Sequence, residues 1–248
     1  MISHSHRCIS IHIPKSAGNS VNRAFGVDWQ DHKDIARHRA ELPADVFNSY
    51  FKFAVVRNPW DRLLSDYNYQ LRKSRPAESK LHLYDERGTR RSFAQWVEAV
   101  LAQSHPYPAS SWGGDVSPGI HRFSPQLDWI TIDGIQAVDY VARFESLDDD
   151  FRVVAQAAGL ECSRLPRRNR RFHFHYSRYY DSSTRDAVGQ FYARDIAAFN
   201  YEFEDRRIRF PWFGCKPAQR ALIPTQVFPA EHPRLAAVVT GGGTSPKS

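Results

Sequence analysis

Two short stretches of this chain carry residue types that can hold anions. In residues 15–20, KSAGNS, one lysine precedes small or hydroxylated residues. That composition lets successive backbone N–H groups point into one concavity, where a phosphate or sulfate binds. The stretch is not a Walker A motif, because no G-x-x-x-x-G-K-[ST] pattern is present. For this stretch alone, a plain strand-to-helix connection with a solvated lysine is the alternative.

The second stretch places an arginine and a serine about two helical turns apart. In residues 51–69, FKFAVVRNPWDRLLSDYNY, Arg57 follows an apolar run and Ser65 falls off the apolar face of the next helix. A guanidinium at a strand's carboxyl end and a hydroxyl on the following helix predict a clamp for a second anion. The alternative is that Arg57 pairs with a structural carboxylate such as Asp61.

Each motif lies between a predicted strand and a predicted helix. Residues 9–13 alternate isoleucine with polar side chains, and residues 53–56 form a continuous apolar run typical of a strand buried in a parallel sheet. Asn58 is a good N-cap, and Pro59 suits the first helical position. Helical spacing follows at Val21, Ala24 and Phe25 and at Trp60, Leu63, Leu64, Tyr67 and Leu71. Both motifs are therefore expected at helix N-termini, which favour anions.

Together the two units resemble the sulfotransferases that use 3′-phosphoadenosine-5′-phosphosulfate (PAPS), nearest to the chondroitin, dermatan and heparan 2-O carbohydrate branch and its bacterial relatives. The family pattern I-P-K-[ST]-[AG]-G-[TN]-S, which holds the 5′-phosphosulfate, corresponds to residues 13–20. The pattern F-x-F-x-V-R-N-P-[WF]-x-R-[LF]-x-S, which holds the 3′-phosphate, corresponds to residues 51–65. The resemblance continues through residues 139–160 and 179–203. It implies an α/β fold, P-loop-like and three-layered, with a central mostly parallel sheet flanked by helices.

The resemblance also implies the donor contacts and the absence of a metal requirement. Lys15 is expected to stabilise the charge that develops on the leaving 5′-phosphate. In relatives, a loop near the arginine-rich run 164–178 closes over the nucleotide. The expected donor contacts are Lys15, Ser16, Ala17, Gly18, Asn19, Ser20, Arg57, Ser65, Arg168 and Arg171.

A histidine is the predicted general base. Family relatives carry one ahead of the second strand, and His32 corresponds to it here. With a reference pKa of about 6.5, a histidine is largely neutral yet basic at pH 7. The chain has 11 histidines, and His12, His38 and His121 remain rivals.

The segment 104–126 is the predicted acceptor-binding loop. It is rich in proline, glycine and serine and carries Trp112, His121 and Arg122. Aromatic rings beside polar and cationic groups suit a sugar, and long irregular loops in compact domains are often functional. A carbohydrate or glycolipid acceptor is the expected partner. The alternative is that Trp112 only packs the loop onto the core.

The other elements are predicted to be scaffold. Ser92 begins a helix in a capping-box pattern, and a strand is expected over residues 139–145. Ser146 is expected to cap the next helix, and Gly159 to end it in a left-handed conformation. A last helix is expected to begin at Ser183.

The amino-acid composition limits the cellular compartment and the kinds of partner that are expected for this protein. Lys and Arg total 34 against 27 acidic residues, a net charge of +7 that attracts anions generally. The three cysteines form no C-x-x-C pair, so neither a disulfide framework nor a thiolate metal site is indicated. No signal-peptide pattern or long apolar run is present, which predicts a cytoplasmic enzyme without a transmembrane segment, or a catalytic domain cut from a longer protein. Residues 1–205 are expected to form the sulfotransferase domain, and residues 206–248 an extension with a disordered tail.

Two other classes of protein remain as alternatives. A P-loop-type kinase would use the anion site for ATP, and a basic nucleic-acid-binding protein would act through residues 164–178. The sulfotransferase interpretation implies no nucleic-acid partner. The sequence predicts no particular oligomeric state.

Overall fold

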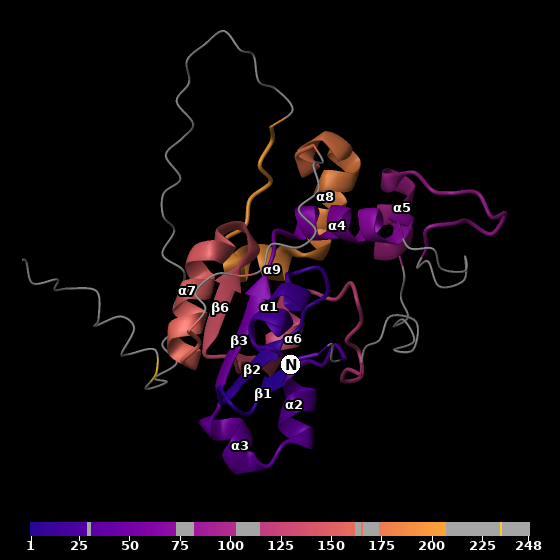
Figure 1. Ribbon diagram of the computed structural model, residues 1–248. Coiled ribbons are helices and arrows are strands. Elements are labelled where there is room, and N and C mark those ends of the chain that lie inside the picture. Colours follow the sequence, from indigo (N-terminus) through magenta and orange to yellow (C-terminus); the bar gives the residue numbers. More distant parts are fainter. Residues whose placement is uncertain are drawn as a thin grey trace, which may run out of the picture.

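A computed structural model describes residues 1–28, 31–72, 82–102, 115–161, 165, 174–206 and 234. Its central sheet has the strand order β1-β2-β3-β6 (Figure 1). The strands are β1 (Ile2–Ser3), β2 (Cys8–Ile11), β3 (Phe51–Val56) and β6 (Tyr140–Arg143). β2, β3 and β6 run parallel, and β1 pairs antiparallel with β2. The expected α/β fold with a mostly parallel sheet is therefore confirmed.

Strand β3 lies at the centre of the sheet and divides the core into two halves. All of its residues are buried. Phe51, Phe53 and Val55 belong to one hydrophobic cluster, and Ala54 and Val56 belong to the other. Because side chains alternate along a strand, these two clusters lie on opposite faces of the sheet. The fold is thus three-layered, and the continuous apolar run reflects burial on both faces.

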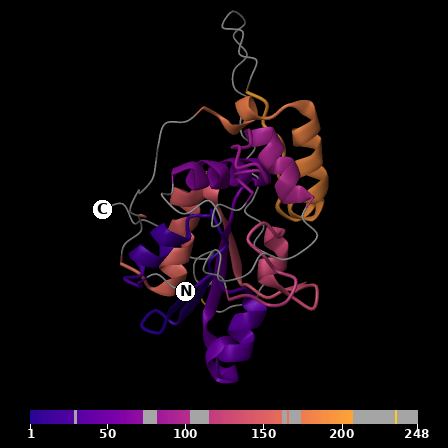
Figure 2. The same cartoon turned by 90° about the vertical axis from the view of Figure 1, so that its right-hand side faces the viewer.

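Helices α1 (Gly18–Ala24) and α7 (Leu147–Ala158) cover the face that carries Phe51 and Phe53. In Figure 2 their indigo and salmon ribbons lie on one side of the sheet. Phe25 directly after α1 and Phe151 in α7 pack edge to face, with ring centroids 6.3 Å apart. α1 is therefore anchored by its own apolar residues immediately behind the turn that contains Lys15.

The hydrophobic cluster on the opposite face joins the sheet to a larger group of helices. They are α2 (Ile35–Glu41), α4 (Pro59–Arg72), α5 (Phe93–Leu101), α6 (Gln126–Ile130), α8 (Ser182–Phe191) and α9 (Ala193–Phe199). Trp60, Trp96 and Val188 share one hydrophobic cluster and so join α4, α5 and α8. Figure 1 shows these three helices gathered at the end of the sheet toward which β3 points. The smaller elements are α3 (Ala44–Ser49), η3 (Phe144–Ser146), η4 (Tyr176–Tyr179) and the hairpin of β4 (Thr131–Ile132) and β5 (Ile135–Gln136).

Several local signals gave correct predictions. α4 begins at Pro59, and Asn58 Oδ1 accepts the Trp60 N–H at 3.1 Å, as expected of an N-cap. Ser92 begins α5 with a complete capping box. Gly159 ends α7 with φ of 65°, a left-handed conformation that favours glycine.

Two local predictions were wrong. Ser146 makes no capping bond to α7, because its hydroxyl instead donates to Asp150 Oδ2 at 2.9 Å. The single helix expected from Ser183 is two helices, α8 and α9, divided at Tyr192. Tyr192 is fully buried, and its hydroxyl donates to the carbonyl of Phe123 at 2.6 Å. A tertiary contact therefore overrides the continuous helical pattern at that residue.

The C-terminal part of the chain leaves one prediction open. The expected extension 206–248 falls almost wholly outside the described residues, which there are residues 206 and 234 alone. Of the helices in the described part of the chain, none is long and apolar enough to cross a membrane.

Candidate active site

The turn between β2 and α1 curls the backbone around Ser16. Lys15 and Ala17, on either side of it, adopt positive φ angles of 69° and 65°. Non-glycine residues rarely adopt this conformation, which costs about 1–3 kcal/mol at such positions, so surrounding contacts must hold the turn. One such contact comes from Arg62 Nε, which donates to the Pro14 carbonyl at 3.2 Å. A backbone curled in this way points its N–H groups inward, as in anion-binding nests.

Not all of the expected backbone donors are available in this turn. The Ser16 N–H donates to the Ile13 carbonyl at 3.3 Å, and the Ser20 N–H to the Ala17 carbonyl at 2.9 Å. Within the described residues, the N–H groups of residues 17–19 have no acceptor. These three donors, at the N-terminus of α1, are the ones that remain to bind an anion.

Gly18 is required by close packing against His12. A Cβ atom at this position would lie 1.8 Å from the His12 ring, so no other residue fits without moving the histidine. The His12 ring in turn packs against His32, with ring centroids 4.1 Å apart. Burial lowers the pKa of His12 well below its usual value, so its ring is neutral. The turn and the predicted base are thus in contact through one neutral ring.

Lys15 extends its ammonium group over an aromatic ring. Its Nζ lies 4.0 Å from the ring centroid of Tyr69, and it makes no ion pair within the described part of the chain. Burial lowers the pKa of Lys15 to about 8; Asp66 opposes this shift, and Arg122 and Arg57 add to it. A partly desolvated cation with no carboxylate partner gains strongly from a bound anion.

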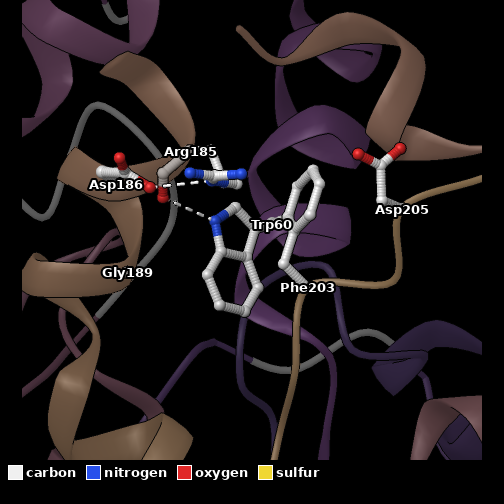
Figure 3. Close-up of a pocket in the computed structure, with 6 residues that line it drawn as sticks. All are labelled: Trp60, Arg185, Asp186, Gly189, Phe203 and Asp205. Carbon is white, nitrogen blue, oxygen red and sulfur yellow. Dashed lines mark hydrogen bonds and ion pairs between the residues drawn. The ribbon is translucent and has the colours of Figure 1, made fainter. Parts of the chain in front are cut away.

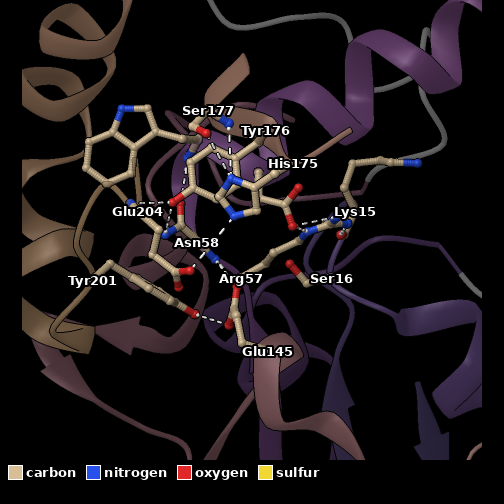
Figure 4. Close-up of polar contacts among 12 residues, drawn as sticks. Lys15, Ser16, Arg57, Asn58, Glu145, His175, Tyr176, Ser177, Tyr201 and Glu204 are labelled. Carbon is tan, nitrogen blue, oxygen red and sulfur yellow. Dashed lines mark hydrogen bonds and ion pairs between the residues drawn. The ribbon is translucent and has the colours of Figure 1, made fainter. Parts of the chain in front are cut away.

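Arg57 links the second motif directly to the first. Its Nη1 donates to the Lys15 carbonyl at 3.1 Å, and Figure 4 shows this side chain reaching the Lys15 backbone. Nε and Nη2 both contact Asp61 Oδ2, at 2.9 and 2.8 Å, and the guanidinium stacks 4.0 Å from the Phe144 ring centroid. The pairing with Asp61 is therefore present. An anion at Arg57 has to share or displace that carboxylate.

One face of α4 runs past both cations. Asp61, Ser65 and Tyr69 are spaced four residues apart and so lie on one side of the helix. Asp61 contacts Arg57, and Tyr69 contacts Lys15. Ser65, which is half-buried, stands between these two residues on the same face of the helix. The clamp of Arg57 and Ser65 around one anion stays a prediction.

His32 is held in one orientation beside the turn. Its Nδ1 lies 2.7 Å from the His12 carbonyl, which can only accept, so Nδ1 carries the proton and Nε2 the lone pair. The ring is buried, with 8% of its surface exposed. Burial lowers the pKa of His32 to about 4, although the bond to His12 opposes this shift. At pH 7, His32 is therefore a neutral base.

The other rival histidines have different surroundings. His38 on α2 is almost fully buried, and burial lowers its pKa to about 3. His121 is partly buried, and its Nδ1 accepts the Phe123 N–H at 3.3 Å. Among these candidates, His12 and His32 are the two that contact each other beside the lysine turn.

The predicted acceptor and loop residues are only partly described. Trp112, Arg168 and Arg171 lie outside the described residues. Arg122 is buried and pairs with both carboxylate oxygens of Asp66, at 2.6 and 2.7 Å. This bidentate pair fixes Arg122 against α4, which suits the anchoring of the loop better than contact with an acceptor.

Sequence reasoning missed two buried residues that join the site together. Arg62 donates to three backbone carbonyls, those of Pro14, Arg122 and Ser124, at 3.2, 2.8 and 3.1 Å. Gln126, the first residue of α6, binds the backbone of Arg57. Arg62 was visible only as one position of a motif, and no local pattern singled out Gln126.

A cavity of about 440 Å³ lies between α4, α8 and the segment after α9 (Figure 3). It is lined by Trp60, Arg185, Asp186, Gly189, Phe203 and Asp205. None of these is a predicted site residue, and on α4 Trp60 lies roughly opposite the face of Asp61, Ser65 and Tyr69. Within the described residues, no group of three or more His, Cys, Asp or Glu side chains could hold a metal.

The fold and the site define an α/β protein in which the motifs of Lys15 and Arg57 meet at the carboxyl ends of neighbouring parallel strands. The model of the sulfotransferase family matches residues 1–202. The chain therefore belongs to the sulfotransferase family, whose members transfer sulfuryl groups. No curated protein and no solved structure matches the chain significantly.

Proposed function

We propose that this protein transfers the sulfuryl group of PAPS to a hydroxyl group of a carbohydrate acceptor. The observation that supports this most directly is the 3.1 Å contact between Arg57 Nη1 and the Lys15 carbonyl, across 42 residues of sequence. PAPS is anionic at both its 5′-phosphosulfate and its 3′-phosphate. Two cationic motifs that meet in one site suit such a donor.

Lys15 and the N–H groups of residues 17–19, which have no acceptor in the described part of the chain, bind the 5′-phosphosulfate in this proposal. The acceptor oxygen attacks sulfur in line, and the bond between sulfur and the bridging oxygen of the 5′-phosphate breaks. The products are the sulfated acceptor and adenosine 3′,5′-bisphosphate. Lys15 stabilises the charge that develops on the leaving phosphate, and its ammonium supports this role because it makes no ion pair within the described residues.

Arg57 and Ser65 bind the 3′-phosphate, with Arg168 and Arg171 as further contacts. The phosphate shares or displaces Asp61 at the guanidinium and accepts a hydrogen bond from the Ser65 hydroxyl. ATP lacks this 3′-phosphate, so the clamp distinguishes PAPS from ATP. No metal is required, because the sulfuryl group carries less charge than a phosphoryl group.

His32 accepts the proton of the acceptor hydroxyl through Nε2. Its pKa of about 4 without ligand keeps it unprotonated at neutral pH. The negative charge of a bound donor raises that pKa toward the range in which general bases are most effective. His12 supports this role because its carbonyl fixes the protonated nitrogen of His32.

The acceptor is a sugar hydroxyl of a polysaccharide or glycolipid. The carbohydrate branch of the family resemblance favours this class, and Trp112 and His121 are the proposed contacts. The buried pair of Arg122 with Asp66 lets Arg122 hold the described end of this segment, residues 115–126, against α4.

A thermal-shift panel separates this proposal from its two alternatives. Adenosine 3′,5′-bisphosphate should stabilise the protein more than ATP does, and an oligonucleotide should have little effect at physiological salt. Preferential stabilisation by ATP with magnesium would indicate a kinase, and salt-sensitive stabilisation by the oligonucleotide would indicate a nucleic-acid-binding protein. Sugar acceptors are then screened with labelled PAPS, using the Lys15→Ala variant as the blank.

A further inference from the structure

Gln126 pairs with the backbone of Arg57 as a neighbouring strand would. Its Oε1 accepts the Arg57 N–H at 2.8 Å, and its Nε2 donates to the Arg57 carbonyl at 2.8 Å. The side chain is completely buried at the start of α6. Both backbone groups of the residue after β3 are thereby fixed at the point where the chain leaves the sheet.

The same glutamine also contacts the lysine turn. Its Oε1 accepts from Ser16 Oγ at 3.4 Å, so one oxygen atom contacts both motifs. Asp195 on α9 also binds this glutamine. Its Oδ2 accepts hydrogen bonds from the Gln126 backbone N–H at 2.7 Å and from Gln126 Nε2 at 3.3 Å. Every polar atom of the Gln126 side chain is thus engaged, and its position is determined by three elements.

We propose that Gln126 is a positioning residue that fixes the spacing between the lysine turn and the strand end of Arg57, so that the site recognises two phosphate groups as a pair. This inference rests on the proposed function. The direct link from Arg57 Nη1 to the Lys15 carbonyl uses the guanidinium that has to turn toward the 3′-phosphate. The link through Gln126 uses the Arg57 backbone and is kept when the guanidinium moves.

The test compares a ligand with two phosphate groups against a ligand with one. Affinities for adenosine 3′,5′-bisphosphate and adenosine 5′-monophosphate are measured by calorimetry for the unmodified protein and for Gln126→Met, which keeps the length of the side chain but not its hydrogen bonds. The ratio of the two affinities should fall about tenfold in Gln126→Met. Gln70→Met is the control, because Gln70 is also buried and its Nε2 has no partner within the described residues.

The ratio separates positioning from simple destabilisation. A variant that is only less stable loses affinity for both nucleotides together, and an unchanged ratio in folded Gln126→Met would overturn the inference. If the unmodified protein does not prefer the bisphosphate, the proposed function itself fails, which is a different result.

A second measurement needs no variant. In the unmodified protein, adenosine 5′-monophosphate should fill the lysine turn and slow amide hydrogen exchange at Arg57 and residues 126–130, because Gln126 joins these segments. Slower exchange there supports the inference. Protection confined to residues 15–20 would contradict it, even if Gln126→Met does not fold.

Discussion

The two anion motifs are built alike, but only the cation of the second motif is already paired with a carboxylate in the described part of the chain. Both follow parallel strands that pair in register, with Ile11 opposite Ala54. Lys15 rests on an aromatic ring with no carboxylate partner in the described part of the chain, whereas Arg57 is already bound to Asp61. The first cation gains from any suitably placed anion, and the second only exchanges one anion for another. The comparison predicts that Lys15 contributes mainly to turnover and that Arg57 contributes mainly to the choice of nucleotide.

The backbone groups of the two motifs differ in the same way. Within the described residues, the N–H groups of residues 17–19 at the start of α1 have no acceptor, and no side chain caps this helix. At α4 the Asn58 N–H donates to Glu145 at 2.7 Å, and Asn58 itself caps the Trp60 N–H. Figure 4 shows Glu145 in this network, with the Lys15 side chain extending away from it. On the proposed function, we therefore expect a phosphate to contact the first motif mainly through backbone N–H groups and the second through side chains.

Removing Lys15 should have the largest effect. Lys15→Ala should lower turnover about a hundredfold or more with donor and acceptor saturating, as loss of one charge-stabilising donor does. Sulfated product is measured with labelled PAPS, and Arg152→Ala, which removes a surface cation on α7, is the control. Normal turnover by Lys15→Ala would remove Lys15 from the mechanism.

Removing the paired cation should instead weaken donor binding. Arg57→Ala should lower affinity for adenosine 3′,5′-bisphosphate roughly ten- to a hundredfold, because a charged hydrogen bond of about 1.5–3 kcal/mol is lost. Affinity for adenosine 5′-monophosphate should change much less, which calorimetry with both nucleotides would show. Equal losses for the two ligands would mean that Arg57 does not bind the 3′-phosphate.

Local sequence signals predicted the elements that position both motifs. The apolar run before Arg57 gave the buried central strand, and Asn58 with Pro59 gave the start of α4. These predictions succeeded because the signals for a buried strand and for a helix cap are carried by residues that are adjacent in the sequence. Tyr192 shows the limit, since its contact with the distant Phe123 carbonyl broke a pattern that looked like one helix.

The contacts that join the site could not be predicted, because they are non-local. Gln126 meets Arg57 across 69 residues, and Arg122 meets Asp66 across 56. A glutamine at a helix start and an arginine in a loop carry no sequence signal of their partners. For Arg57, both interpretations of the motif were open, and the structure shows the pair with Asp61 beside the contact with Lys15.

A change in pH tests the contribution of Lys15 to nucleotide binding. Because the pKa of Lys15 is about 8 without ligand, the group is charged at pH 7 and loses its proton as the pH rises. In the complex, the bound anion keeps Lys15 protonated, whereas Lys15 of the free protein loses its proton as the pH rises. Affinity for adenosine 3′,5′-bisphosphate should therefore fall about tenfold between pH 7 and pH 9. Lys15→Arg, which stays charged, should abolish this dependence. A fall that persists in Lys15→Arg would assign the titration to another group.

The smallest expected effect comes from the carboxylate that occupies Arg57. Asp61→Asn keeps the shape of the side chain but removes the charge that competes with a phosphate for the guanidinium. Affinity for adenosine 3′,5′-bisphosphate should rise roughly threefold, a change typical of one screened charge near a binding site. Asp149→Asn, at a surface pair on α7, controls for the change in net charge. Weaker binding by Asp61→Asn would show that the carboxylate orients Arg57 for the phosphate, so that the second motif would be organised by its acid rather than inhibited by it.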